Sequence, residues 1–531
     1  MITVAQAIVK CLENENVDTV FGIPGAAICP FYDALFKSNI KHILMRHEQN
    51  AGYATNGYSR IKNKAEVCIA TSGPGALNLI TAIATAYMDS VPMIIITGQV
   101  SSDLLGRDVF QEADITGAVE PFVKHSFLLN QKNDVEITFK SAFHIAQTGR
   151  KGPVLIDIPV DIQKELIDFS YPKSIDIRSY KPNVNGHFKQ IERVISAISS
   201  SSKPILCIGG GVFLADAKKE VLELSNKCNI PIVSTMMGFS SVSTSNENFL
   251  GMIGMYGNET ANLALNQADL VLLIGARVGD RAVMSPLGLC KTAIIIHIDI
   301  DPAEIGKNIK TDIPLVGDAK NILKQINSNI TSTTKPFWIT KTKKQISQTN
   351  YCAKTFFNEL FLRVDDNATI VTDVGQNQIW AVNEFCVKNG RLLANGGMGA
   401  MGYAIPAGIG AIFADKNVQT ISICGDGGFQ MSMCELATIT ENHLPLKIVI
   451  INNNALGLVK EQQDIEYNKN EIGVIFKNNP SFTEISRASN IKAQQISSCD
   501  DFHFIDEMLN SKDAFLLEVI IDKDEKAITT I

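Results

Sequence analysis

Two short strings near the end of the chain combine residue types that can bind a diphosphate through a metal ion. The first is Gly425-Asp426-Gly427-Gly428 and the second is Asn452-Asn453-Asn454, which places Asp426 and Asn453 27 residues apart. A carboxylate and an amide oxygen are hard ligands that suit octahedral Mg²⁺, and this ion also takes oxygens from phosphates. The chemistry indicated is therefore the binding of a phosphorylated cofactor through magnesium.

Each string follows an apolar run that is typical of a buried parallel strand, at residues 420–424 and 446–451. Residues 431–438 are predicted to form a helix between the two strands. Open α/β sheets bind ligands at the carboxyl ends of their strands, so we expect Asp426 and Asn453 to share one sheet edge. A Gly-Asp-Gly string alone is also typical of an ordinary strand-end turn, and the spacing and the asparagines are what favour a metal site.

The rest of the chain alternates apolar strands with helical patterns, which predicts an α/β fold. The clearest predicted strands are residues 19–22, 67–71, 93–97, 204–211, 270–275 and 293–301. Irregular or polar segments at 171–186 and 332–348 divide the chain into blocks. We therefore predict three doubly wound parallel-sheet domains, over residues 1–170, 190–330 and 350–531.

The composition of the 531-residue chain argues against several classes of protein. It has 45% hydrophobic and 19% charged residues, which is ordinary for a globular protein, and its net charge of −7 argues against a nucleic-acid partner. The N-terminus has no signal-like pattern and no run approaches about 18 apolar residues, so we expect a cytoplasmic protein without membrane contact. The 11 cysteines show no C-x-x-C spacing, which argues against zinc, iron–sulfur clusters and a disulfide framework.

Further strings of specific residues follow one another along the chain. They include Phe21-Gly22-Ile23-Pro24-Gly25, Arg46-His47-Glu48-Gln49, Ser72-Gly73-Pro74-Gly75, Phe110-Gln111-Glu112-Ala113-Asp114, Gly275-Ala276-Arg277, Thr372-Asp373-Val374-Gly375-Gln376 and Gly399-Ala400-Met401-Gly402. In number, order and spacing, these strings and the metal-binding strings resemble the catalytic (large) subunits of acetolactate (acetohydroxyacid) synthase. That family consists of thiamine-diphosphate enzymes, and the resemblance covers nearly the whole chain.

The resemblance implies that the chain binds thiamine diphosphate and Mg²⁺. Glu48 matches the glutamate that hydrogen-bonds N1′ of the aminopyrimidine and promotes the tautomer whose N4′ takes the proton from C2. Met401 matches the residue that holds the cofactor bent. The implied cofactor-binding positions are Glu48, Gln376, Met401, Gly425, Asp426, Gly427 and Asn453, and the implied metal positions are Asp426, Asn453 and Ala455. Judged by residue type alone, Glu48 also fits a solvated helix-end carboxylate, and Met401 fits a core residue.

The implied activity is that of acetolactate synthase, a transferase that acts in the first common step of branched-chain amino-acid biosynthesis. Pyruvate loses CO₂, and the remaining hydroxyethyl unit joins a second 2-oxo acid, the acceptor. Gln111 could donate a hydrogen bond to a developing oxyanion, and Arg277 matches an arginine thought to hold the acceptor carboxylate. Without the resemblance, a surface amide and a surface ion pair are the simpler interpretations. The implied catalytic set is Glu48, Gln111, Phe110, Gly25, Met401 and Arg277.

The resemblance also implies an FAD that lies over the middle domain in a structural role rather than a redox role. Its contact positions are Arg150, Gly209, Gly210, Gly211, Met252, Gly275, Arg277, Asp299 and Asp318. The three consecutive glycines do not form a G-x-G-x-x-G fingerprint, and by themselves they indicate only a permissive turn. The FAD is therefore an expectation from the resemblance alone.

The chain departs from the family pattern at several positions. Gln462 stands where many members carry a tryptophan that favours the ethyl group of 2-oxobutanoate, and one methylene is worth roughly 1–3 kcal/mol of discrimination. We therefore predict that pyruvate is the preferred acceptor. Lys151, Val160 and Gly279 also replace the usual residues, and the chain ends at Ile531, short of a tail that closes over the site in many relatives. Closure and substrate choice are the properties that these changes affect.

The partners that the resemblance implies are pyruvate, a second 2-oxo acid and another copy of the chain. The cofactor would bridge the first domain of one subunit and the third domain of another, so a homodimer is the minimum unit and a homotetramer is also consistent. A small regulatory subunit is left open. Two alternatives remain, another thiamine-dependent decarboxylase or carboligase in a specialised pathway and a noncatalytic binding subunit, and the product formed from pyruvate distinguishes them.

Overall fold

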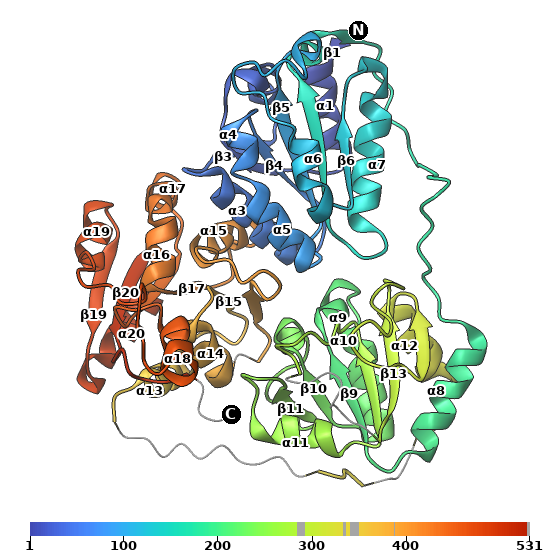
Figure 1. Ribbon diagram of the computed structural model, residues 1–531, viewed down its shortest axis with the longest axis vertical. Helices are drawn as coiled ribbons and strands as arrows, with labels where there is room; N and C mark the ends of the chain where they lie inside the picture. Colours follow the sequence, from blue (N-terminus) through green and yellow to red (C-terminus); the bar gives the residue numbers. More distant parts are fainter. Residues whose placement is uncertain (284–291, 333–335, 340–349, 387, 528–531) are drawn as a thin grey trace.

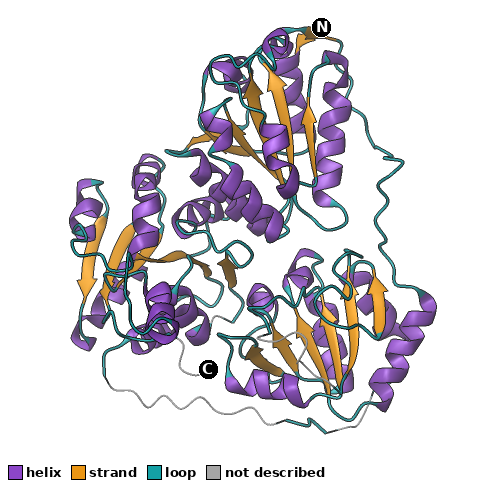
Figure 2. Ribbon diagram, viewed as in Figure 1, coloured by secondary structure: helices purple, strands orange, loops and turns teal. Residues whose placement is uncertain are grey.

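Three six-stranded sheets, each parallel throughout and flanked by helices, form three lobes in the computed structural model (Figure 1). The structure describes residues 1–283, 292–332, 336–339, 350–386 and 388–527, so most of the predicted linker at 332–348 and the end of the chain lie outside it. The arrangement confirms the predicted α/β class with three parallel-sheet domains, and Figure 2 shows helices on both faces of the sheets. Within the described residues, no helix is long and apolar enough to cross a membrane.

The first sheet has the order β3-β2-β4-β5-β7-β6. Its strands are β2 (Thr19–Gly22), β3 (Lys41–Leu44), β4 (Glu66–Ala70), β5 (Met93–Gln99), β6 (His125–Leu128) and β7 (Pro153–Pro159). Its main helices are α1 (Val4–Asn14), α2 (Cys29–Phe36), α3 (Glu48–Lys62), α4 (Pro74–Leu77), α5 (Ile80–Met88), α6 (Ile115–Val119) and α7 (Val135–Gln147). Strands β4, β5 and β7 are buried along their whole length, as expected of central parallel strands covered on both faces. A separate antiparallel pair joins β1 (Ile2–Thr3) to β8 (Leu166–Ile167).

The middle sheet has the order β11-β10-β9-β12-β13-β14. Its strands are β9 (Pro204–Ile208), β10 (Ile232–Ser234), β11 (Phe249–Met252), β12 (Leu270–Ile274), β13 (Ile294–Asp299) and β14 (Ile313–Val316). Its helices are α8 (Phe188–Ser200), α9 (Gly210–Leu214), α10 (Lys218–Cys228), α11 (Glu259–Gln267) and α12 (Ala319–Asn329).

The strand predicted at 204–211 ends earlier than expected, because α9 begins at Gly210 only two residues after Ile208. Glycine allows this abrupt change of direction beside another backbone segment. A Cβ atom on Gly209 would lie 2.2 Å from the carbonyl oxygen of Gly275, and a Cβ atom on Gly211 would lie 2.7 Å from the Cα atom of Gly275. The backbone of the loop after β12 therefore packs directly against the turn that follows β9.

The third sheet has the order β16-β15-β17-β18-β20-β19. Its strands are β15 (Thr369–Thr372), β16 (Arg391–Ala394), β17 (Thr420–Gly425), β18 (Lys447–Asn452), β19 (Lys492–Ile496) and β20 (Phe515–Ile520). Its helices are α13 (Ala353–Arg363), α14 (Gln376–Glu384), α15 (Ala404–Ala414), α16 (Asp426–Ser432), α17 (Leu436–Glu441), α18 (Gly457–Glu466), α19 (Phe482–Ala488) and α20 (His503–Asn510).

The helix predicted at 431–438 was wrong in its limits. Helix α16 begins at Asp426, directly after β17, and a 3-10 turn over Met433–Glu435 separates it from α17. Gly425 is extended at the N-cap, and an acidic residue in the first turn is favoured by the helix dipole. Asp426 is therefore the first residue of a helix rather than part of a turn before one.

The first and third domains meet along helices α3 and α15, which lie side by side in Figure 1. Glycines allow their backbones to touch. A Cβ atom on Gly57 would lie 2.1 Å from the carbonyl oxygen of Ala407, and one on Gly410 would lie 1.8 Å from that of Ala54. The N-terminal residue of α3 is Glu48, so this contact fixes Glu48 relative to the third sheet of the same chain.

Candidate active site

Asp426 and Asn453 lie at the carboxyl edge of the third sheet, on adjacent parallel strands. Strand β17 pairs with β18 up to Gly425 and Ile451, and Asp426 and Asn453 follow one and two residues later. Their exposed fractions are 2% and 5%, so both polar side chains are held inside the protein. The structure thus brings together the two residues that the sequence placed 27 positions apart.

Asn453 is oriented by hydrogen bonds on both sides of its amide. Its Nδ2 donates to Oε1 of Gln376 at 2.7 Å, and its Oδ1 accepts the backbone N–H of Ala455 at 3.1 Å. Gln376 in turn donates to the carboxylate of Glu461 and to the carbonyl oxygen of Glu525, the latter at 3.0 Å. Because an amide oxygen has two lone pairs, Asn453 keeps one for a cation while its orientation is fixed.

Asp426 is held by a residue that the sequence did not reveal. Its Oδ2 accepts from Nδ2 of Asn479 at 2.8 Å, and its Oδ1 accepts the N–H of Gly427 at 3.0 Å. Asn479 also donates to Oδ1 of Asn454 at 3.0 Å and accepts from Gln430 at 3.1 Å. Burial raises the pKa of Asp426 to about 6, and the bond from Asn479 opposes that rise. Asn479 lies in a loop 53 residues away, beside a second asparagine, and its position in the sequence carries no signal of such a role.

The donor set at this edge fits magnesium. Asp426 offers a carboxylate and Asn453 an amide oxygen, and the third ligand expected from the resemblance is the backbone carbonyl of Ala455. Among the described residues there is no group of three or more histidine, cysteine, aspartate or glutamate side chains that could hold a metal ion. A site with a single carboxylate suits Mg²⁺ that takes its other ligands from phosphate and water, and it does not suit zinc or iron.

A cavity of about 1590 Å³ opens from this edge to the junction of the three domains. Typical small-molecule pockets are about 300–1,000 Å³, so the space suits more than one ligand. The predicted site residues that line it are Gln376, Met401, Gly425, Asp426, Gly427, Asn453 and Ala455 from the third domain, Arg150 from the first, and Gly210, Gly211, Met252, Gly275, Arg277, Asp299 and Asp318 from the middle domain. Gly209 is not among the lining residues, because it packs beneath them against Gly275.

The other predicted catalytic residues lie elsewhere. Glu48 is partly exposed at the start of α3, and its Oε2 accepts from Nδ2 of Asn78 at 2.9 Å. It does not line the cavity, and neither do Gly25, Phe110 and Gln111. The side chain of Phe110 is 87% exposed.

These four residues gather around the loop 71–75, which follows strand β4. A Cβ atom on Gly75 would lie 3.4 Å from Oε1 of Glu48, and one on Gly25 would lie 2.5 Å from the side chain of Thr71. One on Gly73 would lie 2.9 Å from the carbonyl oxygen of Gln111. We call Gly25, Glu48, Phe110 and Gln111 the Glu48 half-site, and Gln376, Met401, Asp426, Asn453 and Ala455 the diphosphate half-site.

Helix α16 separates the two half-sites within one chain. It starts at Asp426, and the 3-10 turn after it ends at Glu435, whose carboxylate accepts from the N–H of Arg46 and from Nδ2 of Asn50, both at 3.0 Å. At a rise of about 1.5 Å per helical residue, the nine steps from Asp426 to Glu435 span about 14 Å. Glu48 therefore lies near the far end of the helix from Asp426.

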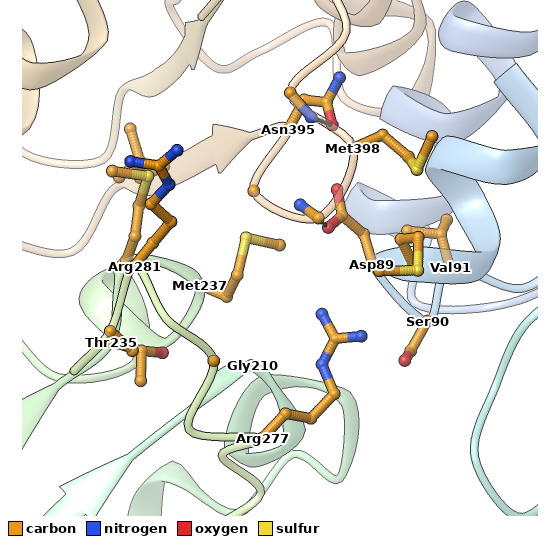
Figure 3. A pocket seen from close by; sticks show the side chains of 18 of the residues that line it. Asp89, Ser90, Val91, Gly210, Thr235, Met237, Arg277, Arg281, Asn395 and Met398 are labelled. Carbon is orange, nitrogen blue, oxygen red and sulfur yellow. Dashed lines mark hydrogen bonds between the residues drawn. The ribbon is translucent and has the colours of Figure 1, made fainter. Parts of the chain in front are cut away.

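Two further predicted residues have distinct positions. Arg277 follows β12 and extends into the cavity (Figure 3), and its carbonyl oxygen accepts from Asn308 at 2.8 Å. Gln462 is exposed on α18, where it donates to Glu466 at 3.2 Å, and it does not line the cavity. The position of Gln462 in this chain therefore gives no contact through which it could choose an acceptor.

Asp373 is a buried residue whose role the sequence did not show. It follows β15, and its carboxylate accepts the backbone N–H groups of Gly402 and Ala404, each at 3.0 Å. Burial raises its pKa to about 6. These bonds fix the loop that carries Met401. The sequence offered Asp373 only as part of the string Thr372-Asp373-Val374-Gly375-Gln376, and its partners lie about 30 residues away.

Models of one enzyme family match the chain in three parts. The N-terminal TPP binding domain of the thiamine pyrophosphate enzymes matches residues 2–118, the central domain matches residues 191–326, and the C-terminal TPP binding domain matches residues 373–519. The two matches described as TPP binding contain the Glu48 half-site and the diphosphate half-site, respectively, and the second match also contains Asn479.

Several curated proteins are similar over nearly the full length. The probable acetolactate synthase large subunit of Methanocaldococcus jannaschii is 41% identical over 98% of this chain and 92% of its own. The acetolactate synthase large subunit of Corynebacterium glutamicum is 41% identical over 94% of this chain and 83% of its own. That of Haemophilus influenzae is 37% identical over 98% of this chain and 95% of its own.

Proposed function

The chain belongs to the thiamine pyrophosphate enzymes and, within them, to the acetolactate synthase large subunits, and from that premise we propose how its residues carry the reaction. It is a thiamine-diphosphate-dependent acetolactate synthase, which decarboxylates pyruvate and joins the two-carbon unit to a second 2-oxo acid. The observation that carries the assignment to this site is the meeting of Asp426 and Asn453 at adjacent strand ends beside the cavity.

Asp426, Asn453 and Ala455 would hold Mg²⁺, which would supply positive charge for the diphosphate of the cofactor. The bonds from Asn479 to Asp426 and from Gln376 to Asn453 keep both ligands in place before the metal arrives. Thiamine diphosphate supplies a thiazolium carbon that adds to the ketone of pyruvate and an electron sink for the bond that breaks as CO₂ leaves. Met401 lies beside Gly427 and is placed to support the cofactor above the metal site.

Glu48 exchanges a proton with the aminopyrimidine of the cofactor. Its Oε2 is held by Asn78, and its partly exposed position leaves the carboxylate accessible from outside the chain. Because Glu48 lies outside the cavity of its own chain, we assign it to the diphosphate half-site of a second copy, so that a homodimer carries two composite sites. Gln111 and Phe110 lie beside Glu48 and line the substrate side of that composite site.

Apolar side chains around the Glu48 half-site support this assembly. The exposed fractions are 43% for Leu77 and 87% for Phe110 on the first domain, and 58% for Met431 and 38% for Met433 on the third. Met431 and Met433 lie between Asp426 and Glu435, the residue that contacts Arg46 beside Glu48. An apolar border around partly exposed catalytic residues is typical of a surface that another subunit covers.

The middle domain binds FAD in the remaining part of the cavity. Eight of the nine expected contact positions line it, and Gly209 supports them from beneath. The volume supports a second ligand beside the thiamine cofactor. Arg277 binds the carboxylate of the acceptor, and a guanidinium offers the planar pair of donors that a carboxylate needs. The preference for pyruvate as the acceptor rests on the resemblance, in which Gln462 replaces the family's tryptophan, and Gln462 itself lies outside the cavity of one chain.

Two coarser features complete the proposal. The domain limits are 1–170, 190–330 and 350–531, and the family matches at 2–118, 191–326 and 373–519 fall within them. The similar proteins are named large subunits, and we assign a small regulatory subunit as a partner on that basis.

The product formed by the purified chain tests the proposed function. The chain is incubated with pyruvate, Mg²⁺, thiamine diphosphate and FAD, and the product is identified as acetolactate or acetaldehyde. We expect acetolactate, and its yield should depend on Mg²⁺. Release of acetaldehyde as the main product would instead identify a decarboxylase. A competition between equal amounts of pyruvate and 2-oxobutanoate tests the acceptor preference, and an excess of acetohydroxybutyrate would contradict the assignment to Gln462.

A further inference from the structure

Glu461 is a buried carboxylate on α18 that the proposed function does not use. Only 4% of the residue is exposed, and it does not line the cavity. Its Oε1 accepts from Nε2 of Gln376, at the start of the neighbouring helix α14 (Figure 1), and from the backbone N–H of Ala527 at 2.6 Å. A carboxylate is costly to bury unless hydrogen-bond donors satisfy it, so these donors fix the place of the side chain.

Hydrogen bonds between side chains connect Glu461 to the metal edge of the sheet. Gln376 donates through Nε2 to Glu461 and accepts through Oε1 from Nδ2 of Asn453 at 2.7 Å. An ionised carboxylate only accepts, so the amide of Gln376 must turn its nitrogen to Glu461 and its oxygen to Asn453. Asn453 must then turn its nitrogen to Gln376. The chain of bonds therefore determines which atom of the Asn453 amide faces the metal position.

Backbone groups near the end of the chain fix the same direction. The carbonyl oxygen of Glu525 accepts from Nε2 of Gln376 at 3.0 Å, and the N–H of Ala527 donates to Glu461. A side-chain amide can exchange its donor and acceptor ends by a flip, but a backbone N–H always donates and a backbone carbonyl always accepts. The direction of the bonds is thus anchored at residues 525–527 and transmitted inward through Glu461 and Gln376.

Helix α18 holds both ends of this arrangement. A Cβ atom on its first residue, Gly457, would lie 1.8 Å from Oε1 of Gln376 and 2.7 Å from Nδ2 of Asn453, so the glycine leaves room for the bonded pair. Further along the helix, Nζ of the buried Lys460 lies 2.8 Å from the carboxylate of Asp524. This ion pair keeps the segment that carries the backbone anchors against the same helix.

We propose that Glu461 is a positioning residue that sets the direction of the hydrogen bonds through Gln376, so that the oxygen of the Asn453 amide, and not its nitrogen, faces Mg²⁺. The inference rests on the proposed role of Asn453 as a metal ligand. Glu461 acts through Gln376 and does not reach the ion itself. Because an amide nitrogen is a donor without a lone pair to offer a cation, a flipped Asn453 would be lost as a ligand even if the backbone did not move.

The Mg²⁺ concentration needed for thiamine diphosphate binding measures this role without turnover. Trp380 lines the cavity, so the quenching of its fluorescence reports binding. Glu461→Leu removes the acceptor at similar size, and we expect the Mg²⁺ requirement to rise about tenfold, as is typical when a residue that orients a metal ligand is lost. Glu461→Gln keeps an oxygen that can accept from both donors, and the N–H of Ala527 fixes its orientation. This variant should therefore stay close to the unchanged chain.

The matched control is Glu466→Leu, which makes the same substitution at an exposed position of the same helix. It should leave the Mg²⁺ requirement unaltered. If Glu461→Gln instead raises the requirement as much as Glu461→Leu, the charge of Glu461 matters rather than the direction of the bonds, and the inference is overturned.

Asn453→Ala separates the inference from the proposed function on which it rests. If Asn453→Ala leaves the Mg²⁺ requirement unchanged, Asn453 is not a ligand and the proposed metal site is wrong. If Asn453→Ala raises the requirement and Glu461→Leu does not, only the inference about Glu461 is overturned.

Gln376→Leu tests the same chain of bonds even if Glu461→Leu does not fold. It leaves Glu461 bonded to Ala527 but breaks the link to Asn453. We expect a rise in the Mg²⁺ requirement of about tenfold, and an unchanged requirement would overturn the inference. Where both variants fold, the double variant should be no worse than Gln376→Leu alone, because residues that act in series are not additive.

Discussion

The diphosphate half-site and the Glu48 half-site lie at equivalent places, the carboxyl ends of two parallel sheets, yet their surroundings differ. Asp426 and Asn453 are 2% and 5% exposed, and each is oriented by hydrogen bonds within the third domain. Glu48 is partly exposed, and the neighbouring Phe110 is 87% exposed. Residues that hold a metal must be arranged before it binds. Residues that meet the cofactor from another subunit remain open until that subunit is present.

On the proposed assembly, one chain contains all of the proposed catalytic residues and still lacks a complete site. The α3–α15 contact fixes Glu48 relative to the third sheet of its own chain. Helix α16 and the 3-10 turn after it place Glu435, which contacts Arg46 beside Glu48, about 14 Å from Asp426. If a second copy supplies the Glu48 half-site, the composite site can form without any movement of α3 relative to α15. Symmetric pairing of two chains completes both sites at once.

Complementation between two inactive variants is the sharpest test of this comparison. Glu48→Gln removes the proton-exchanging carboxylate, and Asp426→Asn removes the metal carboxylate. Each alone should lower kcat by about 10²–10⁴-fold. When the two variants are unfolded together and reassembled, mixed dimers contain one site with both native residues. Because half of the dimers are mixed and each has one such site, about a quarter of the full activity should return. Activity is measured as acetolactate formed per chain.

Pairing Glu48→Gln with Glu48→Ala is the control for complementation, because no mixture of these chains contains Glu48. It should show no recovery. If the mixture of Glu48→Gln and Asp426→Asn also stays inactive while dimers form, both half-sites would have to act within one chain, and the comparison drawn above would be wrong.

Asn479 tests whether the diphosphate half-site is organised in advance. Asn479→Ala removes the 2.8 Å bond to Asp426, and the loss of a residue that orients a metal ligand typically lowers metal affinity by about 10–100-fold. We expect the Mg²⁺ concentration needed for thiamine diphosphate binding to rise by about tenfold or more. Trp380 lines the cavity, so the quenching of its fluorescence can report binding without turnover.

The neighbouring asparagine provides the control for that change. Asn478 is exposed, and Asn478→Ala should leave the Mg²⁺ requirement unaltered. Equal effects of the two substitutions would show that the loop as a whole, rather than the bond to Asp426, supports the metal site.

The sequence predicted the sheets well, because long apolar runs bounded by glycine leave few other structures. Strand β2 was predicted with the limits that the structure has, and β17 and β18 were predicted to within about one residue. The helix after β17 was predicted to begin at Met431 because the glycines at 425, 427 and 428 do not indicate a helix start, although the helix dipole favours an acidic residue such as Asp426 in a first turn. Strand β9 was predicted too long because glycines at 209–211 follow an apolar run without showing where the helix begins.

The predicted site was incomplete where function depends on distant contacts. Asp426 and Asn453 carry their signal locally, as polar residues directly after strands. Asn479 and Asp373 contact partners 53 and about 30 residues away, respectively, and neither has a sequence neighbour that indicates these contacts. The sequence also could not show that Glu48 lies outside the cavity, because the position of one domain on another depends on the packing of α3 against α15.

The α3–α15 contact is the next feature to test, because it determines where Glu48 lies relative to the diphosphate half-site of the same chain. Gly410→Ala would place a Cβ atom 1.8 Å from the carbonyl oxygen of Ala54, so the helices must move apart. Overpacking of this kind costs about 1–3 kcal/mol, and we expect a lower Tm together with a lower kcat. Gly279→Ala is the control, because nothing lies within 4 Å of the added atom. An unchanged Tm for Gly410→Ala would contradict the close helix contact.

Glu66 offers the smallest and most selective effect, because it is a buried carboxylate in the Glu48 domain that belongs to neither half-site. It begins β4, at the opposite end from the loop 71–75, and it is 0% exposed with Lys64 3.2 Å away. Burial raises its pKa from 4.5 to about 8. Between these values the folded chain holds a proton that the unfolded chain releases, so folding stability falls as the pH rises through this window, by up to about 1.4 kcal/mol per pH unit.

Glu66→Gln removes that titration. The Tm of the variant minus that of the unchanged chain should therefore grow from pH 4.5 to about pH 8 and stay constant above it, while kcat remains the same throughout. Thermal unfolding of both chains across this range checks the first expectation, and acetolactate formation checks the second. A Tm difference that does not change with pH would mean that Glu66 is ionised in the folded chain. A large loss of kcat would show that a fully buried carboxylate such as Glu66 also contributes to the reaction. Exposure to a second subunit would then not be what distinguishes Glu48, the proposed catalytic carboxylate, from structural ones.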